Sequence, residues 1–144
     1  MKRLFRIIFA SIFLALTATA AYPCSCEFWK PQKKLRKASA VFVGEVVEIG
    51  TNNTDRFLTV SIKFKVDRYW KGIKESQVTV ISAAGICCTC GLRVEIGGKF
   101  LIYAFKFESG QLETSLCMSL RLDSEVAADE IKILGRGKTL KPQS

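Results

Sequence analysis

Residues 57–66 read FLTVSIKFKV, and this stretch decides the fold class because its apolar and polar residues alternate without a break. A period of two is typical of a β-strand with one face in a protein core and the other in water. The core face would hold Leu58, Val60, Ile62, Phe64 and Val66. The solvent face would carry Thr59, Ser61, Lys63 and Lys65.

Similar stretches lie on both sides of this one. Runs rich in β-branched and aromatic residues predict further strands at 40–49, 77–82, 92–96, 99–107 and 111–117. Glycine, asparagine and other turn residues predict turns at 51–55, 70–72, 97–98 and 109–110. Gly44 interrupts the first of these strands and predicts a β-bulge.

Two segments outside the strands have helical features. Residues 30–40 carry five cations and few apolar residues, which predicts a short surface helix after Pro31 with a solvated charged face. Residues 123–135 begin with the capping residues Asp123 and Ser124 and end at Gly135. The apolar stripe of this second helix would be Val126, Ala127, Ile131 and Leu134.

The order of these elements favours one architecture. Five or six short strands and a late helix predict a mainly β fold. We expect an OB-fold-like small antiparallel β-barrel with a short N-terminal helix and a C-terminal helix. A β-sandwich is the alternative, and the late helix fits it less well. Residues 22–144 would form this single domain, since the chain shows neither an internal repeat nor a linker.

The first 21 residues have the features of a cleaved secretion signal. Lys2, Arg3 and Arg6 precede the apolar run 7–16, and small residues at 17–21 offer cleavage after Ala20 or Ala21. A membrane anchor is the alternative, but the apolar stretch 7–21 is shorter than the roughly 20 residues of a membrane span. We therefore expect a secreted or periplasmic protein, with no membrane span after cleavage.

The composition argues against several classes of enzyme. The chain has no histidine, which removes the commonest catalytic base and every His-based zinc site. It also has no phosphate-binding loop, no GxSxG motif and no dinucleotide fingerprint. Without the three signal cations, 22 − 3 = 19 basic residues face 13 acidic ones, a net charge of +6. We expect no enzymatic activity, no cofactor and no nucleic-acid partner.

The six cysteines are expected to form disulfides, because the chain is expected to be exported. Spacing alone leaves 15 pairings open for six cysteines. Cys87 and Cys88 are adjacent, and Cys87 forms a C-x-x-C pair with Cys90. Three interpretations of Cys87 and Cys88 stay open: a further disulfide or vicinal bridge, free or intermolecular thiols, and a metal or redox role.

An ordered set of motifs resembles a known family. The pieces are CSC at 24–26, ASAVFVGEV at 38–46, FKVDRYWKG at 64–72, CG at 90–91, GGKFLIYA at 97–104 and GQLETSLC at 110–117. Together they resemble the netrin-like module, and more closely the N-terminal domain of the tissue inhibitors of metalloproteinases in a compact bacterial form. The resemblance implies two disulfides, Cys24–Cys90 and Cys26–Cys117.

The resemblance also implies a function for the N-terminal cysteines. In that family the amine and carbonyl of the first cysteine chelate the catalytic zinc of a metalloendopeptidase, and the next side chain enters the specificity pocket. Carried over, Cys24 would be the chelator and Ser25 the pocket residue, with Cys26 and Thr89 completing the inhibitory wedge. The protein would hold no metal of its own.

The sequence departs from the family in three respects. Cleavage after Ala20 or Ala21 leaves residues ahead of Cys24, so its nitrogen would not be a free amine. The family's third disulfide has no counterpart, and Cys87 and Cys88 are additional. The leading hypothesis is an inhibitor of a zinc metalloendopeptidase. The alternative is a netrin-like binding or structural module of the cell envelope, with an anionic polymer or an envelope protein as partner.

Overall fold

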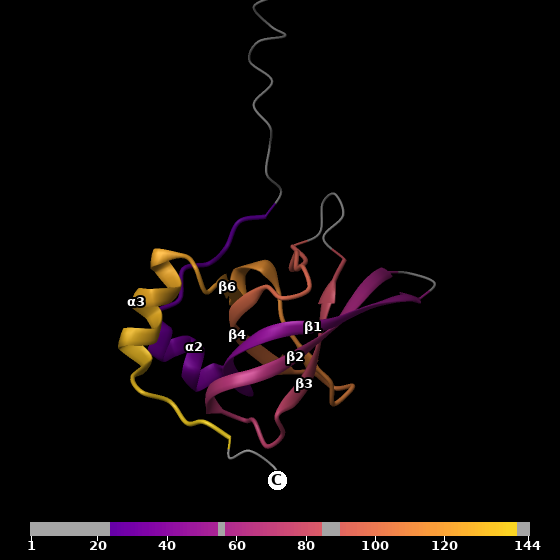
Figure 1. The fold of residues 1–144 in the computed structure, drawn as a ribbon. Helices are drawn as coiled ribbons and strands as arrows, with labels where there is room; N and C mark the ends of the chain where they lie inside the picture. Colours follow the sequence, from indigo (N-terminus) through magenta and orange to yellow (C-terminus); the bar gives the residue numbers. More distant parts are fainter. Residues whose placement is uncertain (1–23, 55–56, 85–89, 141–144) are drawn as a thin grey trace, which may run out of the picture.

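The computed structural model describes residues 24–54, 57–84 and 90–140 (Figure 1). The expected signal segment 1–21 lies outside these residues. Two helices and six strands are described, together with one short 3-10 turn. In chain order they are α2 (Pro31–Lys37), β1 (Ala40–Thr54), β2 (Phe57–Lys71), β3 (Gln77–Ala83), β4 (Lys99–Lys106), β5 (Leu112–Glu113), the 3-10 turn Leu116–Met118, β6 (Ser119–Arg121) and α3 (Glu125–Leu134).

The strands form a closed five-stranded barrel. Its order is β1-β2-β3-β5-β4, and β4 pairs with β1 to complete the circle. The pairing of β3 with β5 is parallel, whereas the other described barrel pairs are antiparallel. Strand β6 pairs with residues Phe100, Leu101 and Ile102 of β4. The expected OB-fold-like barrel with a short N-terminal and a C-terminal helix is confirmed.

Aromatic rings fill the barrel interior. Phe64 lies between Phe42 and Phe100, with edge-to-face ring pairs whose centroids are 5.5 and 6.5 Å apart. Aliphatic side chains such as Ile62 and Ile102 complete this cluster and are fully buried. Burial of these side chains is the main contribution to the stability of the barrel.

The predicted inward face of β2 is correct over most of its length. Ile62, Phe64 and Val66 are buried, and Val60 packs against the same cluster. Leu58 is the exception, because 36% of it is exposed. It lies near the tip of the β1–β2 hairpin, one residue beyond the last residue of β2 that pairs with β3.

The opposite face of β2 is polar as predicted. Lys65 is exposed, and Lys63 is part-exposed and forms an ion pair with Glu48. Neither lysine enters the core, so the predicted register of this strand is confirmed.

A bulge at Gly44 changes the faces of β2 beyond Val66. Gly44 pairs with Val66 and Val43 pairs with Arg68, which leaves Asp67 as the extra residue. A side chain at Gly44 would place its Cβ 2.9 Å from the carbonyl oxygen of Lys65, so glycine is required by this close approach. Beyond the bulge Tyr69 packs on the inner cluster and Trp70 on the outer one.

Three expected elements differ from the structure. Residues 51–54 continue β1 instead of turning, because they pair with the start of β2. Residues 92–95 are not a strand. There Leu92 is buried, and its amide donates to the side-chain oxygen of Ser82 in β3. Within 111–117 only two residues are strand, since the chain then enters a 3-10 turn that leads to the unexpected β6.

The two helices cover the outer face of β1 and β4 (Figure 1). Val41, Val43 and Leu101 point outward and pack with Leu35 of α2 and with Ile131 and Leu134 of α3. Strands β1 and β4 are therefore buried on both faces, which explains their almost continuous apolar sequences. Helix α3 begins at Ser124, whose oxygen accepts from the amide of Ala127, and ends at Gly135. Val126 is exposed, so its predicted place in the apolar stripe is wrong.

A buried polar cluster joins the helices to the barrel. Lys34 of α2 forms an ion pair of 2.6 Å with Glu130 of α3, and the Tyr103 hydroxyl donates to the same carboxylate at 2.7 Å. Burial, together with the hydrogen bond to Glu130, raises the pKa of Tyr103 and keeps its hydroxyl protonated as a donor. The prediction of a solvated charged face for residues 30–40 is therefore wrong at Lys34, which is 7% exposed.

The register of β2 can be tested with two substitutions on one strand. Phe64→Ala should lower the free energy of unfolding by about 3–5 kcal/mol, because it leaves a cavity in the barrel core. Leu58→Ala should cost about 1 kcal/mol or less, since Leu58 is partly in water. Urea unfolding of both variants measures the difference. Equal losses would contradict the position of Leu58 at the hairpin tip.

Candidate functional site

The chain ahead of α2 is fastened to the barrel by two disulfides. Cys24 is bonded to Cys90 and Cys26 to Cys117, with Cα–Cα distances of 5.6 and 5.4 Å. These are the two pairings that the family resemblance implies. The bonded cysteines are 66 and 91 residues apart in the sequence. Residues 24–26 therefore have a fixed place at one end of the barrel although they belong to no helix or strand.

The cysteines that receive the N-terminal segment are themselves held in place. The amide of Leu116 donates to the carbonyl oxygen of Cys90 at 2.9 Å, which connects the two segments that carry the anchoring cysteines. Gly91 follows Cys90 and lies so close to β3 that an added Cβ would be 2.0 Å from the carbonyl oxygen of Ala83. The anchors are thus part of the barrel end to which residues 24–26 are fastened, and we call this end the stapled end.

A buried hydroxyl supports the second anchor. Thr114 donates to the carbonyl oxygen of Tyr103 at 2.9 Å and lies 3.0 Å from the hydroxyl of Ser119. Ser119 in turn donates to the carbonyl oxygen of Ser115. These bonds on both sides of Cys117 leave the 3-10 turn little freedom to move.

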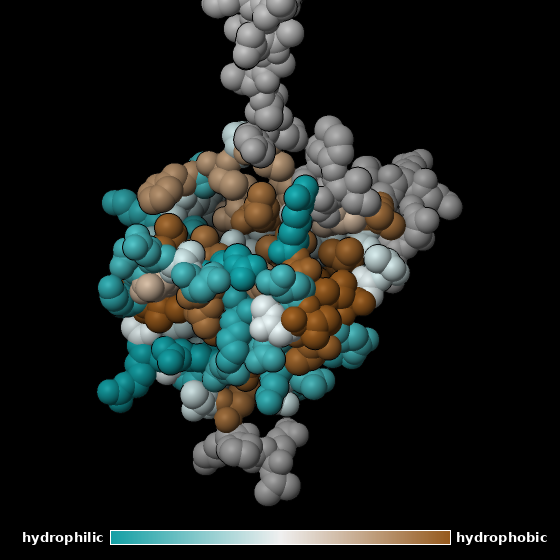
Figure 2. All heavy atoms as spheres, turned by 45° about the horizontal axis from the view of Figure 1, so that its top comes forward, coloured by the Kyte–Doolittle hydropathy of each residue, from teal (hydrophilic) through white to brown (hydrophobic). Residues whose placement is uncertain are grey.

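The fastened segment presents exposed side chains. Ser25 and Cys26 are exposed and Cys24 is part-buried. Phe28 is 89% exposed, and Leu116 on the neighbouring 3-10 turn is 46% exposed. Figure 2 views this end of the molecule and shows brown, apolar surface close to the point where the grey N-terminal chain begins. Phe28 and Leu116 make this end of the barrel a candidate contact surface.

The segment turns into α2 through Trp29. The Lys33 ammonium lies 4.2 Å from the centre of the Trp29 ring, and Lys33 also pairs with Glu27 at 3.6 Å. Pro31 then begins the helix, a position where a missing amide hydrogen costs nothing. The extended segment is therefore tied down at its helical end as well as at the cysteines.

The structure brings together three of the four predicted wedge residues. They are Cys24, Ser25 and Cys26, and they lie at the barrel end next to Cys90 and Cys117. Thr89 lies outside the described residues, as do Cys87 and Cys88. Sequence reasoning missed Phe28 and Leu116. The signal for Phe28 was a large apolar residue in a segment that has no strand pattern.

Across 24–54, 57–84 and 90–140, no three His, Cys, Asp or Glu residues are grouped so that they could hold a metal ion. In the same ranges none of the helices has the length and apolar character needed to cross a membrane.

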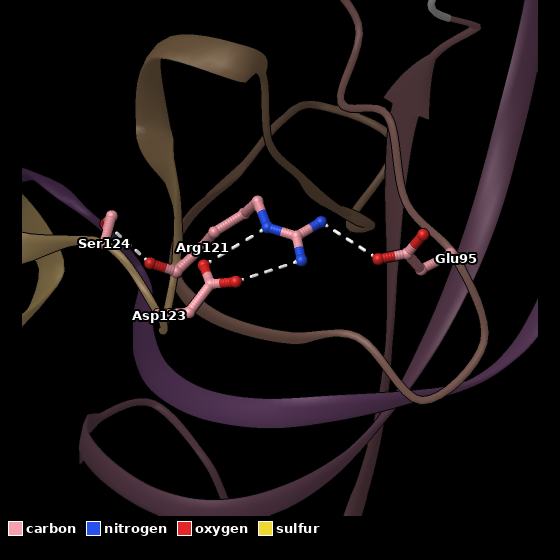
Figure 3. Close-up of polar contacts among 4 residues, drawn as sticks. All are labelled: Glu95, Arg121, Asp123 and Ser124. Carbon is pink, nitrogen blue, oxygen red and sulfur yellow. Dashed lines mark hydrogen bonds and ion pairs between the residues drawn. The ribbon is translucent and has the colours of Figure 1, made fainter.

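A cavity of about 420 Å³ lies beside Arg121, and charged residues line it. The Arg121 guanidinium binds both oxygens of Asp123 at 3.2 Å and one oxygen of Glu95 at 2.9 Å (Figure 3). The hydrogen bond from Arg121 lowers the pKa of Asp123 and keeps it ionised. The Arg121 charge is thus balanced by the carboxylates of Asp123 and Glu95. The Arg121 carbonyl oxygen also accepts a hydrogen bond from the Ser124 hydroxyl, which joins this cluster to the start of α3. We interpret it as a structural clamp.

Comparison with known proteins gives no assignment. No protein-family model matches this chain, and no curated protein matches it either.

The contribution of each disulfide can be measured by removing it. Cys24→Ser/Cys90→Ser and Cys26→Ser/Cys117→Ser should each lower the free energy of unfolding by about 4 kcal/mol in the chain-entropy model. The two losses should be nearly equal, since loop-closure entropy changes slowly between separations of 66 and 91 residues. Urea unfolding provides the values. A loss below about 1 kcal/mol for either pair would show that its bridge does not restrain the unfolded chain.

Proposed function

We propose that this protein is an exported, non-enzymatic inhibitor of a zinc metalloendopeptidase. The observation that carries the proposal is the exposed segment 24–26, which two disulfides fasten to the end of a rigid barrel. The motif resemblance to the tissue inhibitors of metalloproteinases supports the same function. Disulfides are also compatible with an oxidising compartment outside the cytosol.

The chemistry needs only two backbone atoms of Cys24. A catalytic zinc holds three protein ligands and keeps one position for water or substrate. A neutral N-terminal amine and the carbonyl oxygen of the same residue can form a five-membered chelate there and displace the water. The Ser25 side chain would then enter the protease pocket next to the zinc.

The disulfides would make this binding efficient. A segment that is already fixed loses little conformational entropy when it binds, so more of the contact energy appears as affinity. Phe28 and Leu116 are exposed on the same end and could bury apolar surface against the rim of the protease cleft. Inhibition would therefore combine metal chelation with an apolar contact.

Chelation requires that the mature chain begin at Cys24. The expected signal cleavage after Ala20 or Ala21 leaves Tyr22 and Pro23 in front of it. A peptide bond on the Cys24 nitrogen removes its lone pair from coordination. The proposal thus includes a second trimming step that exposes the amine of Cys24.

The N-terminus is the place to test this function. A chain that starts at Cys24 should inhibit at least one member of a panel of metalloendopeptidases. A chain that starts at Tyr22 should be about 100-fold or more weaker, the scale of losing one desolvated polar contact. Acetylation of the Cys24 amine should weaken inhibition to the same extent. The measurement is the inhibition constant of each form against the same protease.

Two outcomes would count against the proposal in different ways. Equal inhibition by the trimmed and extended chains would exclude chelation by the amine while leaving a contact at another surface. The absence of inhibition by every form would favour the alternative, a netrin-like binding or structural module of the envelope.

A further inference from the structure

Five exposed cations gather at the end of β2 that lies away from the disulfides. They are Arg36 and Lys37 at the end of α2, Arg68 in β2, and Arg136 and Lys138 after α3. We call them the basic patch. Figure 1 shows that α2, the end of β2 and the chain after α3 lie together at the lower left of the molecule.

Hydrogen bonds fix the three segments against one another. The Lys71 amino group donates to the carbonyl oxygens of Leu35 and Arg36 at 3.2 and 2.9 Å, which ties β2 to the end of α2. Tyr69 and Lys138 exchange two backbone hydrogen bonds of 2.8 and 2.7 Å, which ties β2 to the chain after α3. The basic patch is therefore built on fixed backbone.

The contact between β2 and the last segment is close. Gly137 has φ +68°, and a Cβ added there would lie 2.9 Å from Cγ of Arg68 and 3.0 Å from the Trp70 ring. The Trp70 indole donates to the carbonyl oxygen of Gly135 at 3.1 Å. Arg68 thus lies directly beside the turn that carries Arg136 and Lys138.

The charges of the basic patch are not balanced by carboxylates. None of its five members forms an ion pair within the part of the chain that the structure describes. Acidic residues of β2 and of the second half of α3 are already paired: Glu130 with Lys34, Asp67 with Lys99, and Asp129 with Lys132. Such a concentration of one charge attracts anions.

We infer that the basic patch binds a linear polysaccharide with a carboxylate or sulfate group on successive sugars. Arginine and lysine side chains spread over three segments can contact several anionic groups of one chain, and the guanidinium fork matches carboxylate and sulfate geometry. The inference concerns a different surface from the stapled end and does not depend on protease inhibition.

Other anionic partners fit the basic patch less well. Binding of single-stranded nucleic acid relies on exposed aromatic rings for base stacking. Tyr69 and Trp70, the two aromatic residues at the patch, instead pack on the two hydrophobic clusters. A lipid surface would favour protruding apolar side chains. The segments 35–38, 68–72 and 135–138 contain none of the large hydrophobic residues that are strongly exposed in the described chain.

The experiment compares two variants of equal net charge. Arg36→Gln/Lys138→Gln removes two cations of the basic patch, and Lys63→Gln/Lys65→Gln removes two from the outer face of β2. Binding to polygalacturonate, dextran sulfate and neutral dextran is measured with the full chain at about 0.15 M salt. We expect binding to both anionic polymers, none to dextran, at least fivefold weaker binding for the patch variant, and less than a twofold change for the control.

Several results would overturn the inference. Equal weakening of both variants would show that the overall charge, not the basic patch, attracts the polymer. Failure of the unmodified protein to bind either anionic polymer would refute it directly. Tighter binding to single-stranded DNA or to phosphatidylserine vesicles at the same salt would assign the patch to another partner. Arg68→Gln/Arg136→Gln provides a second patch variant if the first does not fold.

Discussion

Strand β1 pairs with β2 along one edge and with β4 along the other, and this double pairing closes the sheet into a barrel. Closure removes the free edges that an open sheet would expose and encloses the phenylalanine cluster. It also buries β1 on both faces, so that its outer side chains form the surface on which α2 and α3 pack. Beyond the bulge at Gly44, Trp70 of β2 packs on the same outer cluster as the helices. Both candidate surfaces, the stapled end and the basic patch, depend on this geometry.

The sequence was sufficient for features that depend on local patterns. Alternation along 57–66 identified Ile62 and Phe64 as core residues, and capping residues identified both ends of α3. The motif resemblance supplied the disulfide pairing that spacing left open. Long-range contacts were not predictable in this way. Lys34 reads as a surface cation, and only the fold places it beside Glu130, 96 residues later. Leu58 fits the alternation, yet the hairpin extends past the core.

The two disulfides have different consequences for stability and for function. For stability they restrict the unfolded chain over long loops, which any bridge of that length would do. For function they fix a short exposed segment that has no secondary structure of its own. The basic patch lies at the other end of β2, so a bound polymer would leave the stapled end free. A protein with both surfaces could be retained on an anionic matrix while it inhibits a protease.

The central claim is that the amine nitrogen and the carbonyl oxygen of Cys24 would coordinate the catalytic metal ion of a protease. The most direct measurement is the visible absorption of a cobalt(II)-substituted metalloendopeptidase that the trimmed chain inhibits. We predict that the cobalt bands shift when the trimmed chain is added, because a nitrogen and an oxygen replace the bound water. The chain that begins at Tyr22 should leave the spectrum unchanged. Full inhibition by the trimmed chain with an unaltered cobalt spectrum would contradict the claim.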